Sequence, residues 1–323
     1  MTPVSPYFHP TTTVLIDDNL KTLRQLVQSL GLRGTPYSIF NNPHEGLDFI
    51  NKDQYRETFV DKLSTSDESM EGDSLSFNPR HLVPELKSAD RFGQISVLVV
   101  DYEMPGIKGL DLCEKIENPF IKKILLTGVA DENIAVEAFN KGMIDRYVRK
   151  HDPEFPMLLQ QIVPQVRHKY FQELFHFPLQ TLRKRPESTA LVDPVFITEF
   201  NRLVTKHHIQ EYYLVEGTGS FLMIGADKKL YSLITLDEGL IDAYLNSKSR
   251  DTLTPEKIKS LEKRELMPCY YNPFRAPYLE TDNLKNFLRK PTVLKGHQKT
   301  FYCVFGQGYI DITAQDITTW HHI

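Results

Sequence analysis

The stretch Ile95-Ser-Val-Leu-Val-Val-Asp101 decides the fold, because it is a short apolar run that ends abruptly in a carboxylate. A run that is apolar on both faces predicts a strand covered by helices on both sides, as in a parallel sheet. The run Val14-Leu15-Ile16 ends in the same way, at Asp17-Asp18, and apolar residues at helical spacing follow it from Leu20 to Leu30. A buried strand that ends in carboxylates is therefore expected at two separate places in the chain.

More strand-like runs and helical patterns complete the first half of the chain. The strands are Tyr37–Phe40, Lys123–Leu126 and Ile144–Val148, and the helices are Pro43–Ile50, Leu110–Ile116, Glu132–Asn140 and a segment from Pro156 onward. This alternation predicts an α/β fold with a doubly wound, five-stranded parallel sheet. In such sheets ligands bind beyond the carboxyl ends of the strands, so the polar residues at those ends are the candidate site.

Three carboxylates are expected at that edge, on Asp17, Asp18 and Asp101. Without a partner they would repel one another and resist ionisation. Mg²⁺ removes this conflict, since it takes oxygen ligands in octahedral geometry and keeps several waters. We expect Asp18 and Asp101 to bind it directly and Asp17 through water, with the backbone carbonyl of Glu103 as a further ligand.

The same edge carries groups suited to a phosphoryl group. A carboxylate such as that of Asp101 can act as a nucleophile and form an aspartyl phosphate. Catalysis of this transfer is mostly positioning and neutralisation of oxygen charge, which Mg²⁺ and the ammonium of Lys150 would supply. The hydroxyl of Thr127 can donate to the phosphoryl oxygens, and Gly128 has no side chain to block the incoming group. Each residue alone also fits a helix cap or a surface position; their joint order along the strands favours function.

The motifs in question are Asp17-Asp18, Asp101-Tyr-Glu-Met-Pro-Gly, Leu126-Thr-Gly128 and Tyr147-Val-Arg-Lys150. Together they resemble the receiver domain of two-component response regulators over about residues 12–165. The resemblance implies the flavodoxin-like fold, Mg²⁺ as cofactor, and transfer of phosphate to Asp101 from a sensor histidine kinase. It implies further that Thr127 is the switch hydroxyl, Tyr147 the switch aromatic and Lys150 the partner of the phosphoryl group.

One residue departs from that resemblance. The family usually has proline after the lysine, whereas this chain has His151, with Pro153 two residues further on. The departure concerns the shape of the following loop and not the chemistry. In the family, phosphorylation moves the switch residues and remodels the last strand and helix, so it would alter dimerisation or the activity of an output domain.

An insertion interrupts the receiver-like region at about residues 51–94. Only about half of the residues between Asp18 and Asp101 are needed for the expected strand and helices, given typical element and loop lengths. Within the surplus, Ser64–Ser74 is polar and acidic, a composition typical of a surface loop. The insertion is either a tolerated surface excursion or an appendage that docks a partner or a second copy.

A second module follows a boundary near residue 170. Residues 171–323 hold 19 Lys+Arg and 18 Asp+Glu, net +1, which leaves 19 and 24, net −5, for residues 1–170. We expect a helical connector at 166–190, whose apolar stripe serves either dimer contacts or core packing, and an α+β output domain at 191–323. In that domain Asp193-Pro194 predicts a helix start, and strands at Glu211–Glu216, Phe221–Gly225 and Leu230–Leu236 predict an antiparallel meander.

The output module shows no catalytic motif, so we expect a protein that binds a macromolecule, regulates gene expression, and is not an enzyme. A basic cluster is a weak candidate for nucleic-acid contact, although a solvated surface explains it as well. The cluster consists of Lys285, Arg289, Lys290, Lys295 and Lys299. The alternatives are an output domain that is an enzyme or small-molecule sensor, and an adaptor or phosphate sink that contacts only proteins.

Composition bounds these hypotheses. The 323 residues carry 38 Lys+Arg and 42 Asp+Glu, a net charge of −4, which excludes nucleic-acid binding by bulk positive charge. Three scattered cysteines are too few for a disulfide framework and fit a reducing cytoplasm. The sequence shows no secretory signal and no apolar run near the ~20 residues that span a bilayer, so we expect a cytoplasmic protein without a membrane partner.

Overall fold

The structure is a computed structural model that describes residues 2–30, 35–52, 79–128, 131–175, 190–216, 218–269, 284–306 and 317–319. The contacts divide the chain into two compact units, which are treated separately. The parallel-sheet unit comprises Pro10–Thr58, Ala89–Leu174 and Trp320–Ile323. The antiparallel-sheet unit comprises Met1–His9, Phe59–Ser88 and Phe175–Thr319. Within the described ranges, no helix has both the length and the apolar character needed to cross a membrane.

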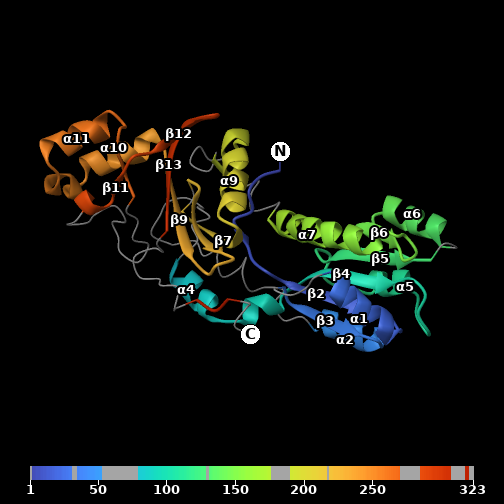
Figure 1. Cartoon of the computed structure of the whole chain (residues 1–323). Coiled ribbons are helices and arrows are strands. Elements are labelled where there is room, and N and C mark those ends of the chain that lie inside the picture. Colours follow the sequence, from blue (N-terminus) through green and yellow to red (C-terminus); the bar gives the residue numbers. More distant parts are fainter. Residues whose placement is uncertain are drawn as a thin grey trace. The chain divides into compact units, whose positions relative to one another are not determined.

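The parallel-sheet unit alternates strands and helices along the chain (Figure 1). Its elements are β2 (Thr12–Ile16), α1 (Leu20–Ser29), β3 (Tyr37–Phe40), α2 (Pro43–Asn51), the 3₁₀ turn η2 (Asp90–Gly93), β4 (Ile95–Asp101), α5 (Gly109–Glu114), β5 (Lys122–Thr127), α6 (Glu132–Asn140), β6 (Arg146–Arg149) and α7 (Phe155–Leu174). All strand pairs are parallel, in the order β3-β2-β4-β5-β6. The predicted doubly wound, five-stranded sheet of flavodoxin type is therefore confirmed.

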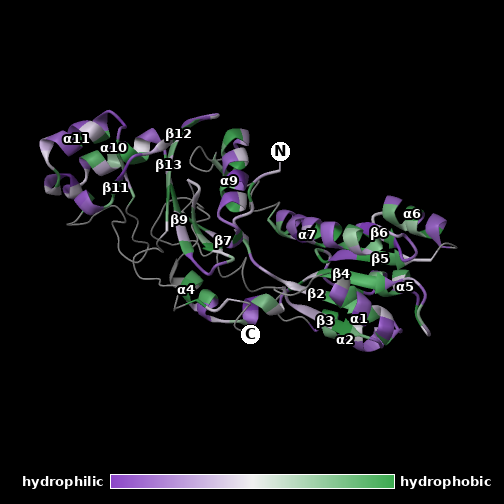
Figure 2. Ribbon diagram, in the orientation of Figure 1, coloured by the Kyte–Doolittle hydropathy of each residue, from purple (hydrophilic) through white to green (hydrophobic). Residues whose placement is uncertain are grey.

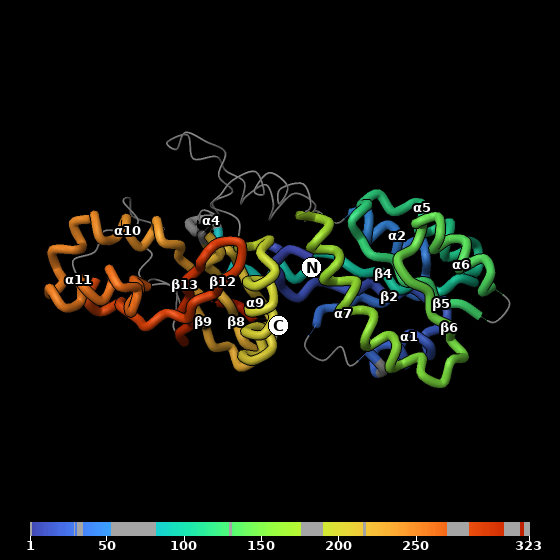
Figure 3. Tube along the Cα trace, turned by 90° about the horizontal axis from the view of Figure 1, so that it is seen from above, coloured from blue at the N-terminus to red at the C-terminus, as the bar shows by residue number. Residues whose placement is uncertain are grey.

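Helices cover both faces of this sheet, which explains why its central strands are apolar throughout. One core joins α2, α5 and α6 to residues such as Ile16 and Val100, and the other joins α1 and α7 to residues such as Leu15 and Val99. Figure 3 shows α1 and α7 on one side of β2 and β4, with α2 and α5 on the other. In the hydropathy colouring of Figure 2, β4 is predominantly green, as a strand buried on both faces must be.

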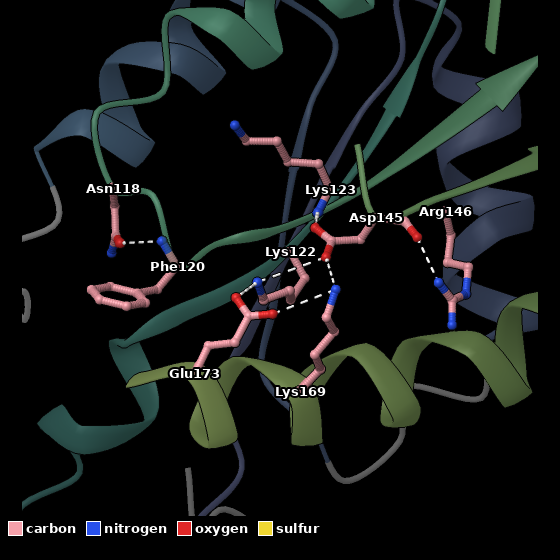
Figure 4. A network of polar contacts seen from close by, with 8 residues as sticks. All are labelled: Asn118, Phe120, Lys122, Lys123, Asp145, Arg146, Lys169 and Glu173. Atoms are coloured by element: carbon pink, nitrogen blue, oxygen red, sulfur yellow. Dashed lines mark hydrogen bonds and ion pairs between the residues drawn. The ribbon is translucent and has the colours of Figure 1, made fainter. Parts of the chain in front are cut away.

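Helix α7 is held at the amino end of the sheet by ion pairs (Figure 4). The Nζ of Lys122, whose side chain is only 4% exposed, lies between Glu173 of α7 and Asp145, 3.7 Å from the latter. Lys169 of α7 completes the group, at 2.9 Å from Asp145 and 3.4 Å from Glu173. Two ammonium groups thus face two carboxylates, so the cluster carries no net charge.

Buried hydrogen bonds fasten the same helix to the start of the sheet. The guanidinium of Arg167 donates to the hydroxyl of Thr13 at 3.0 Å, and the amide of Gln94 donates to the hydroxyl of Tyr170 at 2.8 Å. Burial lowers the pKa of Arg167 to about 10. Residues 166–174 of the predicted connector are therefore the last turns of a helix packed on the sheet. Its residues 176–189 lie outside the described ranges.

The antiparallel-sheet unit follows, as the α+β prediction required. Its elements are β1 (Tyr7–Phe8), α4 (Pro79–Lys87), η4 (Ala190–Val192), α9 (Pro194–Lys206), β7 (Ile209–Glu216), β8 (Ser220–Gly225), β9 (Leu230–Leu236), α10 (Glu238–Asn246), η5 (Lys248–Thr252), α11 (Pro255–Glu262), β10 (Met267–Pro268), η6 (Leu284–Asn286), β11 (Leu288–Arg289), β12 (Thr292–Lys295) and β13 (Lys299–Phe305). Six strands pair in the order β1-β7-β8-β9-β13-β12, and β10 pairs with β11. The predicted cap on α9 is present, because the Asp193 carboxylate accepts a hydrogen bond from the backbone of Val195.

Two pieces of the first half of the sequence belong to this second unit. Strand β1 pairs with β7, with Tyr7 opposite Tyr213. Helix α4, from within the insertion, buries Leu82 and Leu86, and the carbonyl of Leu86 accepts a hydrogen bond from the backbone of Thr318 at 2.9 Å. Residues 53–78 of the insertion, which include Ser64–Ser74, are not among the described ones, and whether the insertion docks a partner stays a prediction.

Candidate functional site

The three predicted carboxylates meet at the carboxyl ends of two adjacent strands. Asp17 and Asp18 follow β2, and Asp101 is the last residue of β4, its neighbour in the sheet. Ligand oxygens of the three lie within 4.8 Å of one another. Asp17 and Asp101 are buried whereas Asp18 is exposed. The chain leaves β2 and β4 on opposite sides, so the cluster sits at the switch point where α/β sheets bind ligands.

Asn19 orients this cluster, and the sequence reasoning did not include it. Its backbone N–H donates to Oδ1 of Asp17 at 2.9 Å. Its side chain accepts from the backbone of Lys21 and Thr22 and so caps α1. An Asn directly before a helical pattern is a recognisable cap signal; the additional bond to Asp17 depends on the tertiary fold.

Lys150 bridges the two buried carboxylates. Its Nζ lies 2.7 Å from Oδ2 of Asp17 and 2.8 Å from Oδ2 of Asp101. Burial alone would lower the pKa of Lys150, but the hydrogen bonds with both carboxylates outweigh it and the pKa is raised. Burial raises the pKa of Asp101, and the charge of Asp17 adds to that, although Lys150 opposes both. One ammonium group thus faces the three carboxyl groups of this edge.

Thr127 presents a hydroxyl with no partner among the residues that the structure describes. The side chain is fully buried at the end of β5, and Oγ1 makes no hydrogen bond. A buried hydroxyl without a partner is costly, so this position favours a ligand that accepts a hydrogen bond. The backbone of Lys150 donates to the carbonyl of Thr127 at 2.9 Å, which fixes Lys150 beside it. A Cβ added to Gly128 would lie 3.4 Å from Oδ2 of Asp131, which is an ordinary van der Waals contact.

Gly109 is a second residue that sequence reasoning missed. A Cβ there would lie 2.1 Å from the carbonyl oxygen of Asp101, so only glycine fits. Its N–H donates to the carbonyl of Tyr102 at 2.8 Å, and Tyr102 in turn donates to Leu126 at 2.9 Å. The loop after Asp101 thus folds tightly back on the strand, which holds Asp101 in place. A glycine eight residues after a strand-end carboxylate gives no such signal without the fold.

Two predicted residues are located without their roles being tested. Tyr147 of β6 is half-buried, its ring 6.4 Å from that of Phe139 in α6. Glu103 is exposed two residues after Asp101, and the contribution of its carbonyl to a metal site stays a prediction. Near them, Arg149 forms an ion pair with Glu132 in the first turn of α6, which links α6 to the end of β6.

The residues present fit Mg²⁺. The donors are oxygens only, as this hard cation requires. Three carboxylates against one lysine leave a local excess of negative charge when all of them are ionised. Burial, and to a smaller extent the charge of Asp17, raises the pKa of Asp101. A divalent cation held by Asp17, Asp18 and Asp101 would remove the excess charge.

The predicted basic residues are all exposed and span η6 to β13. The structure brings Lys295 and Lys299 opposite each other in the β12–β13 hairpin. Lys299 also pairs with Glu238 of α10 at 2.9 Å. Tyr302, adjacent in sequence, is buried and donates to Glu199, so it is part of the packing and offers no stacking surface. Residues 284–306 contain no carboxylate.

The parallel-sheet unit has the fold of a response-regulator receiver domain. The response regulator LqsR of Legionella pneumophila is 29% identical, covering 98% of this chain and 94% of LqsR, with a TM-score of 0.76. A CheY-like response regulator receiver domain protein of Methanospirillum hungatei JF-1 is 22% identical, covering 51% of this chain and 98% of that one, with a TM-score of 0.34. The chain is thus similar over nearly its whole length to a response regulator. Its receiver fold is interrupted by an insertion and is accompanied by a second domain with an antiparallel sheet.

A match to a curated protein covers only a short part of the chain. The methanogenesis regulatory protein FilR1 of Methanothrix harundinacea (strain 6Ac) is 38% identical over 66 residues, which are 20% of this chain. The chain spans only 15% of the length of this curated relative. No family model matches the chain.

Proposed function

We propose that Asp101 accepts a phosphoryl group from a sensor histidine kinase in the cytoplasm, with Mg²⁺ as cofactor. One observation carries the proposal: at one edge of the sheet a lysine is shared by two buried carboxylates, beside a buried threonine hydroxyl that has no partner in the described part of the chain. This is the combination of acceptor, positive charge and hydrogen-bond donor that phosphoryl transfer needs.

The residues divide the chemistry between them. An oxygen of Asp101 attacks phosphorus, the P–N bond of the kinase phosphohistidine breaks, and the imidazole leaves with the electron pair. The ammonium of Lys150, no longer facing a full negative charge on Asp101, then pairs with a phosphoryl oxygen. The hydroxyl of Thr127 donates to another oxygen, and Gly128 leaves the approach open. When bound by the carboxylates and the carbonyl of Glu103, Mg²⁺ supplies neutralisation of the charge on the phosphoryl oxygens.

The switch in this proposal runs from Thr127 to Tyr147. Movement of Thr127 toward the phosphoryl group leaves space that the half-buried Tyr147 enters. The packing of Tyr147 against Phe139 then changes, and with it the surface of α6 and β6. We propose that this surface forms a phosphorylation-dependent homodimer, which changes the activity of the second domain.

The partner of the second domain in this proposal is nucleic acid, through which the protein regulates gene expression. The support is the exposed basic stretch at Lys285–Lys299, which no carboxylate of residues 284–306 offsets. A gel shift with the phosphorylated full-length chain tests this. A shift that disappears at raised salt supports it, since phosphate contacts release counterions; capture of proteins without any shift favours an adaptor.

Asp101→Asn tests the phosphoryl-transfer proposal most directly. The amide is a poor nucleophile, so incubation with radiolabelled acetyl phosphate and Mg²⁺ should label the wild-type chain and leave the variant unlabelled. Asp111→Asn, which removes the same charge from an exposed position in the first turn of α5, should be labelled like wild type. Wild-type labelling of Asp101→Asn contradicts the assignment.

A further inference from the structure

Two cysteines far apart in the sequence meet in the antiparallel-sheet unit. Cys303 lies in β13, and Cys269 directly follows β10. The thiol of Cys303 donates to the carbonyl of Lys290 at 3.2 Å, and the backbone of Cys269 donates to that of Phe287 at 2.7 Å. Both therefore lie against the same short segment, and their thiols are close enough to affect each other's pKa.

The surroundings make the two sulfurs chemically different. The hydrogen bond from Cys269 lowers the pKa of Cys303, burial opposes this, and the guanidinium of Arg289 acts in the lowering direction. The same hydrogen bond, together with burial, raises the pKa of Cys269. Cys303 is also the more exposed of the two, at 8% against 5% for Cys269. Since the thiolate is the nucleophile, we take Cys303 as the reactive member and Cys269 as the partner placed to resolve its oxidation product.

Cys113 provides an internal contrast. It is buried in the core of the parallel-sheet unit, where burial raises its pKa to about 12. The exposed fraction of the residue rises from 1% for Cys113 to 5% for Cys269 and 8% for Cys303. All three are free thiols. The chain thus contains one inert cysteine and one adjacent pair in which a cation favours the thiolate.

We propose that Cys303 and Cys269 are a redox-sensitive dithiol that a peroxide closes to a disulfide. The thiolate of Cys303 attacks one oxygen of hydrogen peroxide, the O–O bond breaks, and the departing hydroxide takes a proton to become water. The sulfur of Cys269 then attacks the resulting sulfenic acid, the S–O bond breaks, and the hydroxide leaves with the Cys269 proton as a second water. The two thiols lose two electrons and the peroxide gains them.

The disulfide would act on the second domain alone. It would join the end of β10 covalently to β13 and enclose β11, which carries Arg289, β12, which carries Lys295, and Lys290 between the two strands. A covalent link across that loop restricts the motion of the basic stretch. This inference does not depend on phosphorylation of Asp101.

Peptide mapping of the full-length protein after peroxide treatment tests the inference. The expected result is a linked peptide pair that contains Cys269 and Cys303, lighter by two hydrogen atoms and separated again by dithiothreitol. Cys113 should be alkylated only after unfolding. Failure to form the linked pair, or a disulfide that contains Cys113, would overturn the proposal.

Variants separate the two roles. In Cys269→Ser the sulfenic acid at Cys303 should persist and be trapped by dimedone, whereas Cys303→Ser should give no dimedone adduct at Cys269. Arg289→Gln should slow alkylation of Cys303 several-fold at neutral pH. Lys290→Gln, the same charge change on the next residue, should not. Equal rates in these two variants would contradict the role of Arg289, and equal dimedone labelling at both cysteines would contradict the division between them.

Discussion

The two ends of the parallel sheet are built from the same parts and differ in charge balance. At the amino end, Lys122 lies between Asp145 and Glu173, and a second lysine completes the group (Figure 4). At the carboxyl end, Lys150 lies between Asp17 and Asp101, no second lysine or arginine from the described ranges pairs with them, and Asp18 adds a third carboxylate. The first cluster is neutral. The second keeps two negative charges in excess when all of its groups are ionised.

The difference shows what distinguishes a structural ion cluster from a functional one. A neutral cluster gains nothing from a ligand, whereas one with uncompensated carboxylates gains from any cation that reaches it. The hydrogen bonds agree with this. The amino end has buried hydroxyls that are bonded, such as Thr13 with Arg167, whereas at the carboxyl end Thr127 has no partner within the described residues.

The largest effect is expected for Lys150→Met in the absence of Mg²⁺. The change leaves two buried carboxylates without a counter-ion. We expect a loss of about 2 kcal/mol in the free energy of unfolding, less than the ~3–5 kcal/mol of a fully buried pair, because the Lys150 side chain is 24% exposed. Urea denaturation with EDTA measures the loss.

Mg²⁺ should restore most of that stability. A ligand at about 100 times its Kd contributes about 2.7 kcal/mol, and in the variant no ammonium competes for the carboxylates. Repeating the denaturation with excess Mg²⁺ gives the comparison. If the variant were insensitive to Mg²⁺, the acidic cluster would not be a metal site.

The sequence located four residues of the carboxyl-end cluster, namely Asp17, Asp101, Thr127 and Lys150. Each of them ends or directly follows a predicted strand, and parallel topology brings the ends of such strands together. The amino-end cluster could not be located from the sequence, because Lys122 lies at the start of an otherwise apolar run and its partners come from a loop and from α7. Nothing in a local pattern specifies that contact.

The next largest effect is expected for Asp18→Asn. Asp18 is exposed and makes no ion pair with another residue that the structure describes, so we expect it to contribute to the proposed metal site and not to packing. We expect Mg²⁺ affinity to fall about tenfold, equivalent to about 1.4 kcal/mol, with unchanged stability in EDTA. Isothermal titration calorimetry measures the affinity. Asp48→Asn, an exposed carboxylate of α2, is the control, and an equal loss in both variants would argue against a ligand role for Asp18.

The sequence could not show to which of the two units helix α4 and strand β1 belong. Leucines spaced by four, Leu82 and Leu86, indicate a helix in the insertion, but they do not say which core the helix joins. The two-residue strand β1 is too short to show any period. Both are placed in the antiparallel-sheet unit by tertiary pairing with β7 and Thr318, which only the structure reveals.

A smaller effect is expected at the neutral end for Lys122→Met. Methionine has a similar volume, and Lys169 still pairs with both carboxylates. The one negative charge left in excess is screened by water, because the Glu173 side chain is 41% exposed, so we expect a loss of about 1 kcal/mol that Mg²⁺ does not reverse. Phosphorylation by acetyl phosphate should be unchanged. Denaturation with and without Mg²⁺ checks this, and recovery of stability on adding Mg²⁺ would remove the distinction between the two ends.

The smallest effect on stability is expected for Thr127→Val, which exchanges a buried hydroxyl without a described partner for a methyl group. No hydrogen bond seen in the structure is lost, so the free energy of unfolding should stay the same or rise by up to about 1 kcal/mol. Thr11→Val is the matched control: Thr11 is also fully buried, but its hydroxyl is bonded to Ser96 at 2.5 Å, and the change should cost about 1–2 kcal/mol. In the Thr127 variant, acetyl phosphate should still label Asp101. The phosphorylation-dependent shift in oligomeric state, measured by light scattering, should be lost. If Thr127→Val destabilised the protein as much as Thr11→Val, the hydroxyl would have a structural partner and would not be held in reserve for a phosphoryl oxygen.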